Sequence, residues 1–137
     1  MSLILTRLPD EPIIIVKPAL PVEQHIEYVF SVDAQCARIV AEQGGPLYRI
    51  VDLRMADLAY SDILLFLDIA KENRRGALTD PHIRTLLVGR HPLLRIAARK
   101  ARQELDLVIP VFASMGEALA HVRAGIGARS GTGRYAS

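Results

Sequence analysis

The stretch that decides the fold covers residues 47–53 and reads Leu47-Tyr48-Arg49-Ile50-Val51-Asp52-Leu53. The turn-forming residues 44–46 precede this mainly apolar run, and an acidic residue stands near its end, which is typical of a strand in a parallel sheet. A loop over 54–60 follows. From Ser61, which we expect to cap a helix, apolar side chains recur at helical spacing until 73–76. Residues 47–76 therefore predict one strand–loop–helix unit.

The same pattern extends to both sides of this unit. Further strands are predicted over 13–16, 83–89 and 108–112, and further helices over 31–42, 92–105 and 115–124. Ser31 is the expected N-cap of the first of these helices, and Ser114 with Glu117 forms a capping box for the last. Residues 22–30 fit either a strand or the start of a helix. Alternating strands and helices predict a single α/β domain over 13–125, with a mixed, mostly parallel sheet of about five strands and about four helices; a flexible tail is expected over 126–137.

Composition agrees with one globular domain. The chain has 137 residues, of which 50% are hydrophobic and 23% charged. No apolar run reaches the ~18 residues that a membrane span needs, and residues 1–12 lack the pattern of an export signal, so we expect a cytoplasmic protein. The one cysteine, Cys36, has no partner for a disulfide and is expected to be a buried apolar residue.

The net charge of +2 conceals an asymmetry between the two halves of the chain. Residues 1–70 hold five Lys and Arg against ten Asp and Glu, a charge of −5, whereas residues 71–137 carry +7. Part of the excess forms a predicted basic face on one helix: Arg95, Arg99, Lys100 and Arg102. This face is either an ordinary solvated surface or a contact for an acidic protein, an anionic lipid headgroup or a phosphate. Nucleic acid is not an expected partner, because aromatic residues are not interleaved with the basic ones and no binding motif occurs.

Three segments in a fixed order carry a family resemblance. They are Val51-Asp52-Leu53-Arg54 before the helix at Ser61, the strand over 83–89, and the strand and helix over 109–120. Together they resemble the STAS superfamily, in particular its SpoIIAA-like branch of anti-sigma-factor antagonists. In the phosphorylatable members a loop similar to Asp-Ser-Ser-Gly-Leu-Gly enters the second helix, and its second serine accepts a phosphate from a partner kinase. The equivalent residues here are Tyr60-Ser61-Asp62-Ile63-Leu64-Leu65, so the resemblance implies that the phosphoacceptor motif is not intact.

Several polar residues have both a functional and a structural interpretation. Asp52, Asp57 and Asp62 are expected near the carboxyl ends of strands, where α/β sheets bind ligands, yet a solvated loop with a capping acid explains them better. Ser61 lacks the glycines of a nucleophile elbow, and N-capping accounts for it. The four histidines lack the spacing of a paired metal site.

The predicted function is therefore binding rather than catalysis. We expect a non-enzymatic protein-interaction module of the STAS type in bacterial regulation, with no catalytic residues, metal or cofactor. Its partner-binding residues are predicted to be Asp57, Tyr60, Ser61, Asp62 and Phe66. The alternative is a carrier of a small apolar molecule or lipid, whose signature would be an apolar pocket between a helix and the sheet. Pairing of two copies into a homodimer is a further open alternative.

Overall fold

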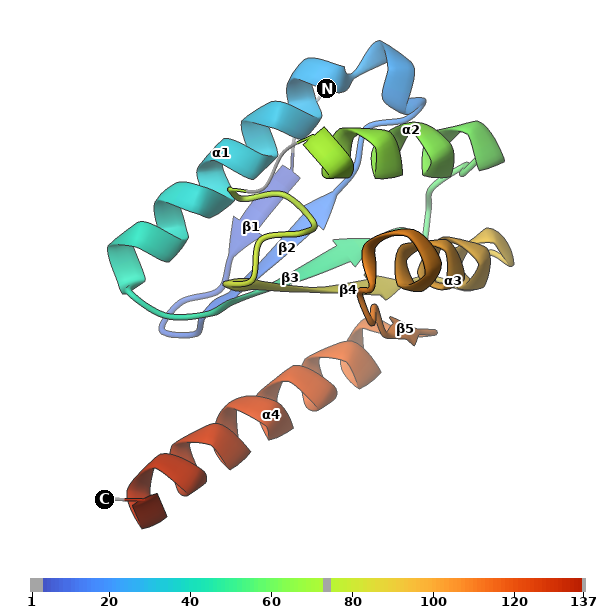
Figure 1. Cartoon of the computed structure of the whole chain (residues 1–137). Coiled ribbons are helices and arrows are strands. Elements are labelled where there is room, and N and C mark those ends of the chain that lie inside the picture. The colour runs from blue at the N-terminus through green and yellow to red at the C-terminus, as the bar shows by residue number, and fades with distance from the viewer. Residues whose placement is uncertain (1–3, 73–74, 137) are drawn as a thin grey trace.

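A computed structural model describes residues 4–72 and 75–136 of the chain. Strands and helices alternate along most of this length (Figure 1). In chain order the elements are β1 (Ile4–Arg7), β2 (Ile13–Lys17), the short 3₁₀ helix η1 (Val22–Gln24), α1 (Ile26–Gln43), β3 (Leu47–Asp52), α2 (Tyr60–Glu72), β4 (Ile83–Val88), α3 (Leu93–Leu105), β5 (Val111–Phe112) and α4 (Met115–Ala136).

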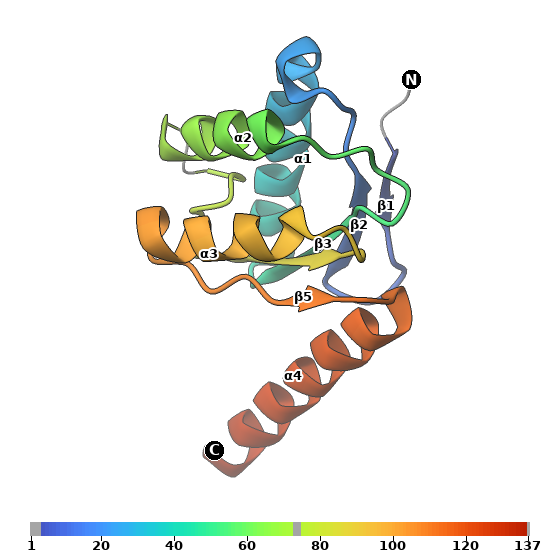
Figure 2. The same cartoon turned by 90° about the vertical axis from the view of Figure 1, so that its right-hand side faces the viewer.

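The strands lie in the sheet in the same order as in the sequence. β1 pairs antiparallel with β2, and each later strand pairs parallel with the one before it. Because β2 to β5 advance in one direction, right-handed crossovers place α1, α2 and α3 on the same face of the sheet. Figure 2 shows these three helices on that face and α4 alone on the other. The predicted α/β class, with a mixed, mostly parallel sheet of five strands and four α-helices in the described residues, is confirmed.

Alternating side chains of the interior strands build a core on each face of the sheet. Ile13 and Ile50 pack beneath α4, whereas Ile14 and Leu47 pack beneath α1. A third apolar cluster joins α2 to α3. Burial on both faces explains why β2 and β3 are nearly continuous apolar runs. The residues that complete these clusters include Val88 of β4 with Ala118 and Val122 of α4, Val32, Cys36 and Ile39 of α1, and Ile63, Leu67 and Ala101 between α2 and α3.

The structure corrects several sequence expectations near the N-terminus. Residues 22–30 form η1 and the first turns of α1, and no strand occurs there. The fifth strand is instead β1, which pairs with β2 from outside the expected 13–125 range. Ser31 is not an N-cap, because α1 already begins at Ile26, with His25 in the cap position.

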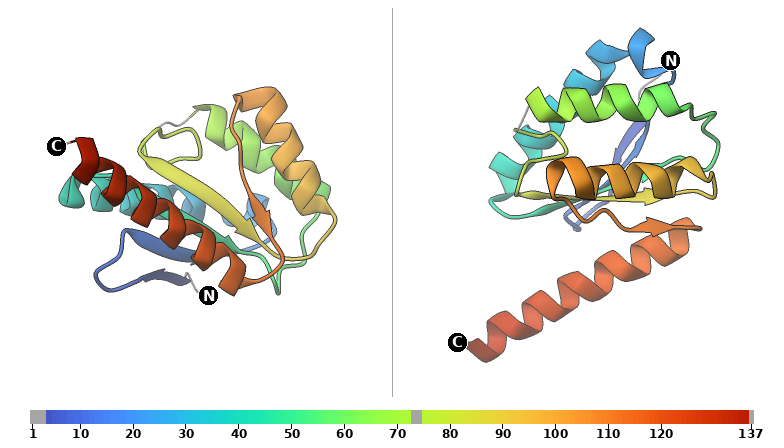
Figure 3. Two further views of the ribbon diagram at one scale, coloured as in Figure 1. Left: turned by 90° about the horizontal axis from the view of Figure 1, so that it is seen from below. Right: turned by 45° about the vertical axis from the view of Figure 1, so that its right-hand side comes forward.

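The C-terminal expectations are also revised. α4 continues beyond residue 124 to Ala136, so the backbone over 126–136 is helical where a flexible tail was expected (Figure 3). β5 is shorter than the predicted 108–112 strand and holds only two residues. The N-cap at Ser114 is confirmed, because its hydroxyl accepts a bond from the Glu117 amide at 3.2 Å. The hydroxyl also donates to the Glu117 carboxylate at 3.2 Å, where a full capping box would have that carboxylate accept the Ser114 amide.

Candidate functional site

An exposed, partly apolar surface surrounds the start of α2. Met55 in the preceding loop is 96% exposed, and Tyr60 and Leu64 on α2 are 47% and 40% exposed. Asp57 and Ser61 are exposed beside them. We call these five residues the α2 surface. Large apolar side chains this open to water cost solvation free energy unless a partner covers them, so the α2 surface is a candidate contact site.

Asp62 does not belong to that surface, although the sequence places it there. It is only 4% exposed, and its two carboxylate oxygens accept backbone bonds from Val22 and Ala59, both at 2.9 Å. Ala59 directly precedes the helix, so Asp62 caps α2 by reaching back from its first turn. The bond to Val22 also ties η1 to α2. The acid therefore has a structural role, and the capping role expected of the exposed Ser61 is performed by Asp62.

The other two aspartates expected near the carboxyl ends of strands, Asp52 and Asp57, lie in different surroundings. Asp52 accepts two bonds from the Arg54 guanidinium, at 2.9 Å each, and this side-chain hydrogen bonding lowers the pKa of Asp52. Asp57 is exposed and Asp62 is buried. Within residues 4–72 and 75–136 no group of three His, Cys, Asp or Glu side chains could hold a metal ion. The three aspartates thus do not converge on one site.

The predicted basic face lies on α3, next to α2. Arg95, Arg99 and Arg102 are exposed, while Lys100 is half-buried. Lys100 Nζ is 3.1 Å from Glu104 and 5.9 Å from the centre of the Tyr60 ring, which raises its pKa chiefly through the Glu104 bond. Lys100 therefore links the basic face to the α2 surface.

Beneath α2 lies an apolar cavity of about 110 Å³. It lies between one face of the sheet and the two helices α2 and α3, with η1 at one side. Its wall is almost entirely aliphatic and aromatic, and includes Val22, Val51, Phe66, Leu67, Leu87 and Ala97. We refer to this space as the larger cavity.

A smaller cavity of about 80 Å³ adjoins it on the side of α1. The two cavities share wall residues, namely Pro18, Val22, Val51 and Phe66. Phe66, one of the predicted partner-binding residues, is half-buried and contributes to both walls. The smaller cavity is lined by a pair of oppositely charged residues, Asp33 and Arg49, whereas Asp62 is the one ionisable residue among the described residues in the wall of the larger cavity.

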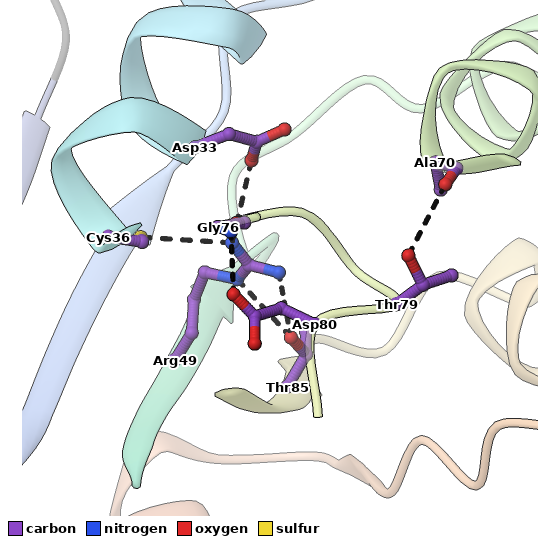
Figure 4. A network of polar contacts seen from close by, with 8 residues as sticks. All are labelled: Asp33, Cys36, Arg49, Ala70, Gly76, Thr79, Asp80 and Thr85. Carbon is purple, nitrogen blue, oxygen red and sulfur yellow. Dashed lines mark hydrogen bonds and ion pairs between the residues drawn. The ribbon is translucent and has the colours of Figure 1, made fainter. Parts of the chain in front are cut away.

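Arg49 is the centre of a buried polar network (Figure 4). Its side chain projects from β3 and only 3% of the residue is exposed. The guanidinium donates to the Thr85 hydroxyl at 3.0 and 3.2 Å and to the Gly76 carbonyl at 2.7 Å. It also lies 3.5 Å from the Asp33 carboxylate and 3.7 Å from the sulfur of the fully buried Cys36. These contacts satisfy a charge that would otherwise be costly in the core.

In this network, burial destabilises the charged form of Asp33. Burial raises the pKa of Asp33 to about 6, and the neighbouring Arg49 offsets this only in part. The loop beside it is fixed by Asp80, whose carboxylate accepts the Gly76 amide at 2.7 Å and the His82 amide at 2.8 Å. Gly76 has a φ of +75°, and a Cβ there would lie 1.8 Å from the backbone oxygen of Asp33. α1, β3 and this loop are thus locked together around Arg49.

Sequence reasoning missed the Arg49 network. One signal was present: a charged residue stands in the middle of the apolar 47–53 run, where alternation places it on a buried face. A charge at such a position needs a buried partner. The sequence does not reveal which residue supplies it, because Asp33 lies on another element.

Comparisons with known proteins identify no relative: no family model, curated protein or solved structure matches the chain. The STAS resemblance therefore rests on its residues alone. Among the described residues, no helix is both long enough and apolar enough to cross a membrane.

Proposed function

We propose that the chain is a non-enzymatic protein-interaction module of the STAS, anti-sigma-factor antagonist type, acting in the bacterial cytoplasm without an intact phosphoacceptor motif. The observation that carries this proposal is the exposure of Met55, Tyr60 and Leu64 within a ten-residue segment, at residues 55–64. The order of the strand and helix motifs gives independent support for the family assignment.

The chemistry of the surface indicates what the partner should present. Apolar side chains at the start of α2 adjoin the exposed arginines Arg95 and Arg99 of α3 through the Tyr60–Lys100 contact. A protein with an apolar centre and acidic groups at its rim would complement both parts. An anionic lipid headgroup or a phosphate would fit the basic residues but would itself leave the exposed apolar side chains without a partner.

The test is affinity capture from a lysate of the source organism with two matched variants. The triple variant Met55→Ser, Tyr60→Ser, Leu64→Ser should lose a partner that wild-type protein retains. Val108→Ser should keep it, because Val108 is 72% exposed but lies outside the α2 surface. Capture of the same proteins by all three forms would refute the assignment of this surface.

A second candidate function is that of a carrier for a small apolar molecule, and the larger cavity favours it. About 110 Å³ of apolar space is comparable to the ~150 Å³ engineered cavity that binds benzene, and is too small for a lipid. Native mass spectrometry of protein isolated from source cells should then detect a bound small molecule that dissociates on unfolding. Ala97→Leu, which places a larger side chain in the cavity, should lack this molecule. If protein from source cells carries no such mass, carriage of a resident ligand is refuted.

A further inference from the structure

We infer that the two cavities form one ligand site with a polar end, which takes a small uncharged apolar molecule carrying a hydroxyl group. The hydroxyl would donate to the Asp33 carboxylate in the smaller cavity, and the apolar body would lie against Val51 and Phe66 and extend into the larger one. This inference rests on the second candidate function and adds the chemical class of its ligand.

The first argument is that Asp33 has spare capacity to accept hydrogen bonds. A carboxylate offers about four acceptor positions. Asp33 has an ion-pair contact of 3.5 Å to the guanidinium of Arg49, which is longer than a good hydrogen bond, and the same guanidinium nitrogen donates to the Gly76 carbonyl at 2.7 Å. No hydrogen bond to the Asp33 carboxylate is found among the described residues. Figure 4 shows one of its oxygens directed to Arg49 and the other turned away.

Asp62 provides the contrast. It also lines the larger cavity, but both of its oxygens already accept backbone amides. Thr85, the other polar residue at the larger cavity, accepts two bonds from Arg49. Of the two carboxylates at the cavities, Asp33 is therefore the one with acceptor positions left for a bound molecule.

The charges and the burial of Asp33 and Arg49 determine which kind of hydrogen-bond donor a ligand can bring to Asp33. An ammonium group would be desolvated in an apolar space and would approach the Arg49 guanidinium, while an anion would be repelled by Asp33. A pure hydrocarbon would fill the cavities but offer the carboxylate no donor. A neutral hydroxyl avoids these costs. The raised pKa of Asp33 agrees, since it reports a carboxylate that is poorly compensated in the unliganded protein.

Because the two cavities share wall residues, a single molecule can occupy both. Pro18, Val22, Val51 and Phe66 belong to both cavities, whose volumes of about 110 and 80 Å³ suit one aromatic ring or a short aliphatic chain. Phe66 lines both spaces, and its ring can adjust to an occupant by side-chain rotation without backbone movement.

The test compares phenol with toluene, a pair of nearly equal shape that differ in the hydroxyl. Titration of isotopically labelled full-length protein, followed by nuclear magnetic resonance, should show both probes perturbing Val51 and Phe66. Phenol should bind at least about tenfold more tightly, as expected of a hydrogen bond to a charged acceptor. Equal affinities would overturn the inference while leaving the carrier proposal intact, and binding of neither probe would overturn both.

Variants assign the preference to Asp33. Asp33→Leu should remove the advantage of phenol while toluene still binds, and Asp33→Asn, which keeps an acceptor oxygen, should retain part of it. Ala97→Leu should weaken both probes, whereas Ala120→Leu on the exposed face of α4 should weaken neither. An undiminished preference for phenol in both Asp33 variants, each folded by its spectrum, would refute the role of this carboxylate.

Discussion

Replacing Gly76 with alanine would drive a methyl group into the backbone of α1. The added Cβ would lie 1.8 Å from the carbonyl oxygen of Asp33, and the φ of +75° is itself strained for alanine by about 1–2 kcal/mol. The clash can be relieved only if the loop moves away from α1. That movement would break the 2.7 Å bond from Arg49 to the Gly76 carbonyl and the 2.7 Å bond from the Gly76 amide to Asp80.

The magnitude follows from these losses. Each of the two bonds involves a charged group and contributes about 1.5–3 kcal/mol, so with the backbone strain Gly76→Ala should lower the free energy of unfolding by at least about 4 kcal/mol. Gly44→Ala is the matched control. Its φ is +69°, but a Cβ there meets nothing within 4 Å, so only the strain of about 1–2 kcal/mol applies.

Urea unfolding of the wild type and both variants measures the difference. A loss of at least about 4 kcal/mol is a large part of the ~5–15 kcal/mol that holds a domain of this kind together, and should move the midpoint far to lower urea. If the two variants unfold within about 1 kcal/mol of each other, the close packing of the loop on α1 and the importance of the Arg49 network are refuted.

Three further changes test other contacts. Asp62→Ala should lower the free energy of unfolding, measured with urea, by about 2 kcal/mol, because the Val22 amide loses its acceptor. Ser61→Ala should lower it by less than about 0.5 kcal/mol, and the reverse ranking would make Ser61 the true cap of α2. The pKa of Asp33 is raised from 3.8 to about 6, so its stabilising contribution is complete below pH 3.8 and is lost as pH rises through 6. Relative to Asp33→Asn, the wild type should therefore lose about 2 kcal/mol between pH 4 and 7, and parallel pH profiles would contradict this. Ser114→Ala should lower the free energy of unfolding by about 1 kcal/mol in the same assay, and an unchanged value would contradict the role of Ser114 as the N-cap of α4.

The parts of the fold that could be predicted are those whose signal is local. β2 and β3 are buried on both faces, and their apolar runs show this directly in the sequence. β1 carries no comparable signal, because it is a four-residue edge strand recognised only by its pairing with β2. In residues 22–30 the alternation of Ile26, Tyr28 and Phe30 imitates a strand. The helix forms there nevertheless, and leaves Phe30 exposed.

In the candidate site, too, features with a local signal could be predicted from the sequence, and features that depend on distant residues could not. Exposure of Tyr60 and Ser61 at a helix start could be anticipated from their position in the sequence. The burial of Asp62 could not, because its partner Val22 lies forty residues earlier. The pairing of Arg49 with Asp33 likewise depends on how α1 crosses the sheet, which no pattern within either segment records.

The two bonds that Asp62 accepts also provide a way to observe motion. The amide hydrogens of Val22 and Ala59 point at the same side chain, and Val22 and Asp62 both line the larger cavity. If η1 separates from α2 to admit a molecule, the Val22 amide loses its acceptor, whereas the Ala59 amide keeps its bond within the start of α2. Hydrogen exchange should then be faster at Val22 than at Ala59, and a ligand that fills the cavity should slow the exchange of Val22 selectively. The Val22 amide thus reports how often the interior opens to solvent, and the Ala59 amide on the same carboxylate is its internal reference.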